Sequence, residues 1–135
     1  MTTVEDLTWL GYVTEVECLT EFMKAGYKVS LPYQQASPYD LIVDDGLCLY
    51  KVQVKKAKST KSIWKGKESI HLVTGKQNGK RMFPRSIKYL DSEVDWFATM
   101  YEGECYIYPQ SLVNGVNTYI PIEKLEKYKL KGLKK

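Results

Sequence analysis

Apolar residues recur at helical spacing near the start of the chain. Over residues 3–25 the recurring positions form one side of a helix: Tyr12, Val16, Leu19 and Met23. Gly26 follows directly, and glycine is a common helix stop because it readily adopts a positive φ angle. The pattern predicts a first helix whose apolar stripe faces the core.

Alternation of apolar and polar residues replaces the helical pattern after Gly26. Strands are predicted at 27–31, 39–44, 47–55, 70–74, 81–83, 94–100 and 105–108. Residues 56–68 are predicted to form an exposed loop, and a short amphipathic helix is predicted over 123–130. This order predicts an α/β fold, with a mixed central β-sheet flanked by helices, in a single domain over residues 1–135.

A β-hairpin is the sharpest local prediction. Asp45-Gly46 between two predicted strands is typical of a two-residue turn, which sets Asp40 opposite Lys51. Because side chains alternate along a strand, one face is predicted to be core, with Leu41, Val43, Cys48, Tyr50, Val52 and Val54 on it. The opposite face gathers four polar side chains, those of Asp40, Lys51, Gln53 and Lys55.

The basic residues of the chain are concentrated in its middle. The formal charge of the 135 residues is only +4, yet residues 51–88 hold 12 Lys or Arg against one acid, Glu68. Such a segment suggests a polyanionic partner such as DNA, although a solvated lysine face has the same composition. The candidate DNA contacts are Lys56, Lys58, Lys61, Lys65, Lys67, Lys76, Lys80, Arg81 and Arg85.

Cysteine and histidine usage argues against a zinc site. Cys18, Cys48 and Cys105 are far apart, and His71 is the only histidine. We expect buried or half-buried free thiols, as in proteins of a reducing compartment. No apolar stretch is long enough to cross a bilayer, so we expect an intracellular, cytoplasmic protein with no membrane partner.

Three side chains on the polar face of the hairpin suit phosphodiester hydrolysis. Mg²⁺ prefers oxygen ligands, and such an ion can activate water and stabilise the leaving oxygen. Asp40 and Gln53 offer oxygens, while Lys55 offers an ammonium that can stabilise developing negative charge. Glu15 on the first helix could add a carboxylate, because a charge at the edge of a core-facing stripe is costly unless it is paired or ligating.

These residues resemble the PD-(D/E)XK nuclease superfamily, and in particular its small branch of group I intron-encoded homing endonucleases. The matching segments run from Gly11 to about Pro109, most of the chain: Gly11-x-x-x-Glu15, Ala25-Gly26-Tyr27-x-Val29, Leu31-Pro32, Tyr39-Asp40-Leu41-Ile42-Val43-Asp44-Asp45-Gly46, Val52-Gln53-Val54-Lys55-x-Ala57, Val94-Asp95-Trp96-Phe97-Ala98 and Tyr106-Ile107-Tyr108-Pro109. Two positions depart from the family pattern. Tyr39 precedes Asp40, so the literal PD dipeptide is absent, and Gln53 replaces the usual acid, a variant similar to that of the homing branch.

The resemblance implies a restriction-endonuclease-like core and a Mg²⁺-dependent DNA endonuclease in which Mn²⁺ can substitute. It implies that Asp40 and Gln53 bind the metal ion together with the backbone carbonyl of Val54. Lys55 is then the catalytic lysine, and Glu15 completes the site. Because a chain this small forms one active site, cutting both strands of a DNA duplex predicts a homodimer or homotetramer.

Other interpretations stay open on the sequence alone. Asp40 could merely cap a strand, and Glu15 could be a surface acid of the helix. A Holliday-junction-resolving nuclease or a restriction enzyme would use the same four residues, and a DNA-binding module of this fold would use none of them for catalysis. His71 is left outside the candidate site, because a lone strand histidine is more often structural or a DNA contact. Asp95 is expected at a strand edge or in a turn.

Overall fold

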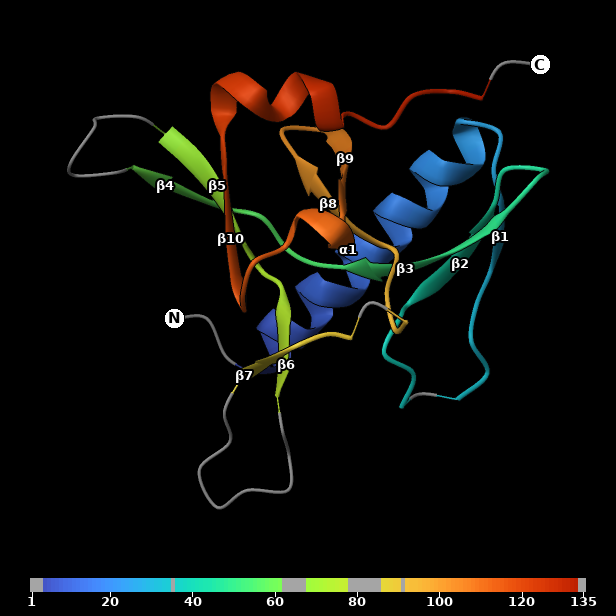
Figure 1. Ribbon diagram of the computed structural model, residues 1–135, viewed down its shortest axis with the longest axis horizontal. Helices are drawn as coiled ribbons and strands as arrows, with labels where there is room; N and C mark the ends of the chain where they lie inside the picture. Colours follow the sequence, from blue (N-terminus) through green and yellow to red (C-terminus); the bar gives the residue numbers. More distant parts are fainter. Residues whose placement is uncertain (1–3, 35, 62–67, 78–85, 91, 134–135) are drawn as a thin grey trace.

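One long helix and a mixed β-sheet form the centre of the fold. The computed structural model describes residues 4–34, 36–61, 68–77, 86–90 and 92–133 (Figure 1). The sheet has the order β1-β2-β3-β8-β9, with β3 and β8 parallel and the other neighbours antiparallel. These elements are α1 (Val4–Lys24), β1 (Lys28–Ser30), β2 (Leu41–Asp44), β3 (Leu49–Val54), β8 (Trp96–Tyr101) and β9 (Glu104–Pro109). The predicted α/β class with a mixed central sheet is confirmed.

A smaller sheet of order β10-β5-β4 and a two-stranded ribbon β6-β7 accompany the central sheet (Figure 1). Two 3-10 helices, η1 and η2, follow β9 and β10. The bounds are β4 (Lys58–Lys61), β5 (Glu68–Val73), β6 (Gly75–Gln77), β7 (Ser86–Lys88), η1 (Gln110–Leu112), β10 (Asn117–Pro121) and η2 (Ile122–Tyr128). None of the helices in the described ranges combines the length and apolar character that crossing a bilayer requires.

Several predicted boundaries were wrong. The predicted loop over 56–68 contains β4, whose polar residues pair with β5. The predicted C-terminal helix is the tighter 3-10 form, η2. The sequence pattern also missed β10, which buries Thr118 and Ile120 on one face. The strand predicted at 81–83 lies outside the described residues.

The central core lies between α1 and the central sheet. Cys18 and Phe22 of α1 are fully buried in one cluster with residues of β2, β3 and β8. The Phe22 ring meets the Tyr27 ring edge-on, with the centroids 5.3 Å apart. The predicted core face of the hairpin is confirmed at four of its positions, which are buried: Leu41, Val43, Val52 and Val54. Tyr50 is half-buried, whereas Cys48 is an exposed thiol, against the prediction that it would be at least half-buried.

The predicted core-facing stripe of the first helix was wrong at three of its four positions. Tyr12, Val16 and Met23 are exposed, whereas Leu19 is half-buried and packs against the core. The helix has a second apolar line at Cys18 and Phe22, and it is this line that packs on the sheet. An apolar period shows where the apolar residues lie on a helix, but it does not show which of two apolar sides meets the core.

The hairpin between β2 and β3 is longer than predicted. Asp44 pairs with Leu49, so the turn contains four residues rather than two. The Asp45 side chain explains the extra length, because its Oδ1 accepts hydrogen bonds from the N–H groups of Leu47 and Cys48, both at 2.8 Å. The pairing is shifted by two residues relative to the prediction, in which Asp44 faced Leu47. A shift of two leaves every side chain on its predicted face, whereas a shift of one would have exchanged the faces.

Candidate active site

Asp40 lies at the open end of the hairpin, directly before β2. Its N–H donates to the carbonyl of Val52 at 2.8 Å, and its Oδ2 accepts from the N–H of Val54 at 2.9 Å. The carboxyl group is therefore held rigidly against β3. Burial raises the pKa of Asp40 above its ordinary value, although the Val54 N–H and the Lys55 ammonium both act to lower it. Such a desolvated acid is uncommon outside functional sites.

Lys55 follows β3 directly, and its N–H donates to the carbonyl of Ala98 in β8 at 2.9 Å. Burial lowers the pKa of Lys55, while the nearby Asp40 carboxylate acts to raise it. The two residues thus influence one another electrostatically, as the predicted shared face requires. The structure brings Asp40 and Lys55 together at one end of the hairpin.

Tyr89 is a contact of Lys55 that the sequence did not indicate. The Nζ of Lys55 donates to the Tyr89 hydroxyl at 3.4 Å and lies 5.4 Å from the centre of its ring. Tyr89 is buried, and burial raises its pKa to about 12, with further contributions from Asp40 and Glu93. The hydroxyl therefore remains protonated at neutral pH. No motif spacing relates residue 89 to residue 55, so only the folded structure could place this ring against the lysine.

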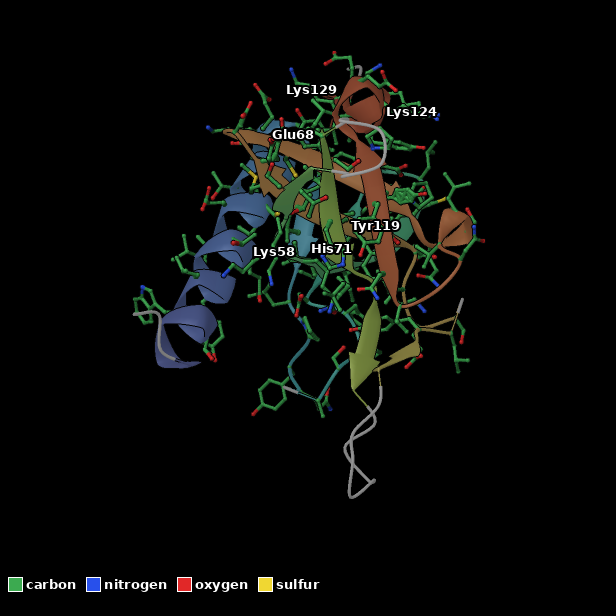
Figure 2. The ribbon with its side chains drawn as sticks, turned by 90° about the vertical axis from the view of Figure 1, so that its left-hand side faces the viewer. Lys58, Glu68, His71, Tyr119, Lys124 and Lys129 are labelled. Atoms are coloured by element: carbon green, nitrogen blue, oxygen red, sulfur yellow. The ribbon has the colours of Figure 1, made fainter. Side chains whose placement is uncertain are left out.

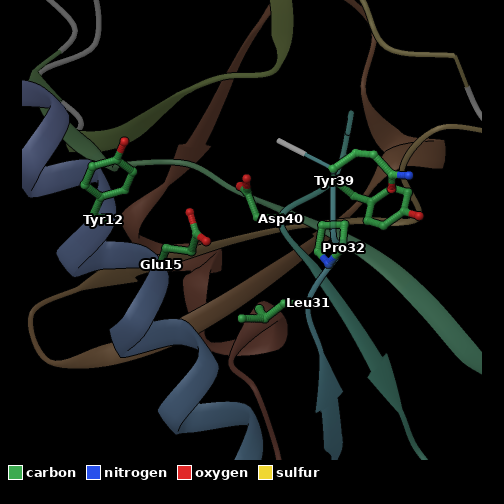
Figure 3. A pocket seen from close by; sticks show the side chains of 7 residues that line it. Tyr12, Glu15, Leu31, Pro32, Tyr39 and Asp40 are labelled. Carbon is green, nitrogen blue, oxygen red and sulfur yellow. The ribbon is translucent and has the colours of Figure 1, made fainter. Parts of the chain in front are cut away.

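Glu15 reaches the same region from α1. Burial raises the pKa of Glu15, and the Asp40 carboxylate raises it further. Both acids line a cavity of about 430 Å³, and Figure 3 shows them projecting from α1 and from the start of β2 into that hollow. The other lining residues are Tyr12, Leu31, Pro32, Gln34 and Tyr39.

Gln53 and Lys51 lie on β3, on the same face as Lys55. The last printed pair of the hairpin is Leu41 with Val52, so extending the register by one residue sets Asp40 beside Gln53. Gln53 is half-buried. Lys51 points elsewhere, because its Nζ donates to the Ser92 carbonyl.

Asp95, directly before β8, is hydrogen-bonded to Lys51 of β3. Its Oδ2 accepts from the Lys51 N–H at 2.8 Å, and its own N–H donates to the Lys51 carbonyl at the same distance. Its carbonyl accepts from the Gln110 N–H at 2.9 Å. These backbone contacts agree with the expected place of Asp95 at a strand edge.

The oxygen donors of this region fit a hard divalent cation. Burial raises the pKa of both carboxyl groups, and the Asp40 carboxylate raises that of Glu15 further, so a bound cation would stabilise both as anions. Among the described residues no three His, Cys, Asp or Glu side chains converge. A third protein ligand would thus have to be an amide or carbonyl oxygen, which Gln53 and the backbone of Val54 can offer.

Two of the predicted DNA contacts have described side chains, and both follow Lys55 in the sequence. Lys56 is half-buried and Lys58 is exposed on β4. Lys58 pairs in register with His71 on β5, and His71 pairs with Tyr119 on β10. The His71 and Tyr119 rings stack with centroids 4.6 Å apart, and Figure 2 shows all three residues across the small sheet.

The structure describes the backbone of two further predicted DNA contacts and no part of the other five. Lys61 and Lys76 lie in β4 and β6, but their side chains are outside the description. Lys65, Lys67, Lys80, Arg81 and Arg85 lie outside the described residues altogether.

Comparisons with known proteins agree with this fold. Residues 8–134 match the family described as PD-(D/E)XK endonuclease. A solved structure titled as a bacterial homing endonuclease, I-Ssp6803I, is similar in fold, with a TM-score of 0.62 and 22% sequence identity over 82% of this chain and 74% of that one. A comparison with curated protein sequences gave no match. Because the family match spans nearly the whole chain, this protein belongs to the PD-(D/E)XK endonuclease family, whose members hydrolyse phosphodiester bonds.

Proposed function

We propose that the protein is a Mg²⁺-dependent endonuclease that cleaves double-stranded DNA at a specific sequence, as homing endonucleases do, within the cell that holds this DNA. The observation that supports this most is the pair of Asp40 and Lys55 at the open end of the hairpin, with Glu15 facing the same cavity as Asp40. Acids and an ammonium at this spacing are the groups that phosphodiester hydrolysis needs.

In this proposal Asp40, Glu15 and Gln53 hold Mg²⁺, which Mn²⁺ can replace. The bound ion supplies charge neutralisation at the phosphate and an activated water. Lys55 stabilises the negative charge that develops on the phosphate oxygens, and it is held in place by its backbone bond to Ala98. The rigid bonds of Asp40 to β3 keep its carboxylate aimed at the same point, because they fix both its backbone and one oxygen.

DNA is proposed to lie along the side of the molecule that carries Lys56 and Lys58. Lys58 is three residues beyond Lys55, which limits the separation of their Cα atoms to about 11 Å. It is therefore within reach of a phosphate close to the one that is cleaved. One active site per chain cuts one strand at a time, so we propose that two or four copies act together as a homodimer or homotetramer.

Two substitutions with a matched control test the proposed active site. Asp40→Ala and Lys55→Ala are expected to lower Mg²⁺-dependent cleavage by about 10³-fold, while DNA binding is retained. Lys51→Ala is the control, because Lys51 is on the same strand and face but its ammonium contacts Ser92. Cleavage at the wild-type rate by either of the first two variants would show that the site is wrong.

The substrate is tested separately with a randomised DNA duplex and a four-way junction. Purified protein is incubated with each in the presence of Mg²⁺, and the ends of the products are sequenced. We expect cleavage at one sequence in the duplex. Preferential nicking of the junction irrespective of sequence would favour a junction-resolving nuclease. Binding without cleavage of any substrate would favour a DNA-binding module.

A further inference from the structure

The outward side of α1 carries large apolar side chains that no described element covers. Trp9 is 69% exposed, Val16 61% and Met23 60%. Tyr12, at 60%, and Val13, at 40%, lie on the same side of the helix. Figure 2 shows α1 along one edge of the molecule, with its outer side free of the rest of the described chain. Scattered single apolar residues are normal on a surface, but a continuous row of this kind marks an interaction site.

The spacing of this row is that of a helix-pairing seam. We call it the α1 stripe, and it consists of Trp9, Val13, Val16, Thr20 and Met23. The steps along it alternate between four and three residues. An alternation of four and three keeps a row facing a neighbouring helix over several turns, which is the a/d pattern of coiled coils. The α1 stripe is therefore shaped to receive another helix.

We propose that the α1 stripe is the contact between two copies of this chain, which pack α1 against α1. The inference rests on the proposed function only in supplying the second copy that double-strand cleavage requires. The exposed area of the stripe with Tyr12 is on the order of 600 Å² per copy. Two copies together thus bury roughly 1,200 Å², which reaches the range of specific interfaces.

The proposed interface lies close to the proposed active site. Tyr12 lines the catalytic cavity and Glu15 is one residue before Val16, so α1 contributes to both the site and the seam. A two-fold axis through the paired helices would bring two active sites to defined places on either side of that axis. Both strands of one duplex could then be cut by one dimer.

Sedimentation velocity of the full chain, without DNA or metal, tests the proposal. We expect the wild-type protein to be dimeric or a dimer of dimers at micromolar concentration. Val16→Glu is expected to reduce the assembly by one step, because it sets a charge at the centre of the seam. Leu47→Glu is the matched control, since Leu47 is an apolar residue that is 93% exposed in the hairpin turn and is not part of the α1 stripe. Thermal unfolding of each variant verifies that it is folded.

A monomeric wild-type protein, or an unchanged assembly in Val16→Glu, would overturn the proposal. The inactive variant Lys55→Ala should still dimerise. Dimerisation without cleavage would thus refute only the proposed function, and cleavage by a monomer would refute only the proposed interface.

Discussion

The two ends of the β2–β3 hairpin carry aspartates in opposite environments. At the closed end, Asp45 accepts hydrogen bonds from the N–H groups of Cys48 and Leu47, which lower its pKa. At the open end, burial raises the pKa of Asp40 even though the Val54 N–H donates to it. The same residue type is therefore stabilised as an anion at one end and destabilised as an anion at the other.

In the proposed function, this difference separates a structural acid, Asp45, from a metal-binding one, Asp40. The Asp45 carboxylate is satisfied by its own turn, and nothing further is needed to hold its charge. Asp40 lines a cavity together with Glu15, and burial there makes its negative charge costly despite the Val54 N–H and the Lys55 ammonium. Natural proteins retain such costly groups mainly where chemistry requires them.

The largest expected effect comes from exchanging each of the two aspartates for its isosteric amide. Asp40→Asn should lower cleavage by about 10³-fold, because the amide removes the charge that the cation needs. It should leave the protein folded and no less stable at neutral pH. Asp45→Asn should leave the cleavage rate unchanged and lower the midpoint of thermal unfolding by a few degrees, because its turn hydrogen bonds weaken.

Cleavage rates at saturating Mg²⁺ and thermal unfolding curves measure both effects. The distinction between the two aspartates is wrong if Asp45→Asn loses activity while it remains folded. It fails equally if Asp40→Asn unfolds, since that would make Asp40 a structural acid like its counterpart.

A smaller effect is expected at Gln53, which lies beside Asp40 in the extended register. Gln53→Glu should keep the fold and add a negative charge to the metal site, which favours tighter binding of divalent ions. We expect a change of about tenfold in the ratio of Mg²⁺- to Mn²⁺-supported activity. Lys51→Gln, on the same face but tied to Ser92, is the control and should not change the ratio. An unchanged ratio in Gln53→Glu would remove Gln53 from the ligand set.

Much of this site could be predicted from the sequence, because strand alternation is robust. The pairing of Asp44 with Leu49 instead of Leu47 changed the register by an even number, so Asp40, Gln53 and Lys55 kept one face. The turn length itself was mispredicted, since it depends on where the Asp45 oxygen finds donors.

The role of α1 could not be predicted in the same way. Its sequence has two apolar sides, and the period of Tyr12, Val16 and Met23 is as regular as that of a core stripe. Only the sheet decides which side is buried, and it selects Cys18 and Phe22. Tyr89 could not be predicted for a related reason. It lies 34 residues from Lys55 in the sequence, and only the folded chain brings the two side chains together.

The pH dependence of stability should also differ between the two aspartates. An acid whose pKa is raised by folding holds its proton more tightly in the folded state, so stability falls as pH rises from 3.8 through the folded-state pKa. Asp40 should contribute this fall, and Glu15 a similar one from 4.5 upward. Asp45, with a lowered pKa, contributes stability above 3.8 that is lost as pH falls further.

Denaturant unfolding across this pH range, with divalent ions chelated, measures these contributions. Asp40→Asn should flatten the fall above pH 3.8, and Asp45→Asn should flatten the loss below it. If Asp40→Asn instead changed the slope below pH 3.8, and Asp45→Asn the slope above it, the environments described for the two ends of the hairpin would be wrong.

The smallest expected effect concerns how Lys55 is held at the open end. Tyr89→Phe removes the hydroxyl that accepts from the Lys55 Nζ at 3.4 Å but keeps the ring 5.4 Å from it. A single hydrogen bond of this length contributes little, so we expect cleavage to fall by about threefold to tenfold with little change in DNA affinity. Tyr108→Phe is the control, because its hydroxyl donates to the Leu112 carbonyl instead. A merely structural role for Tyr89 would lower stability without moving the rate of the folded enzyme, whereas a positioning role lowers that rate at full occupancy of DNA.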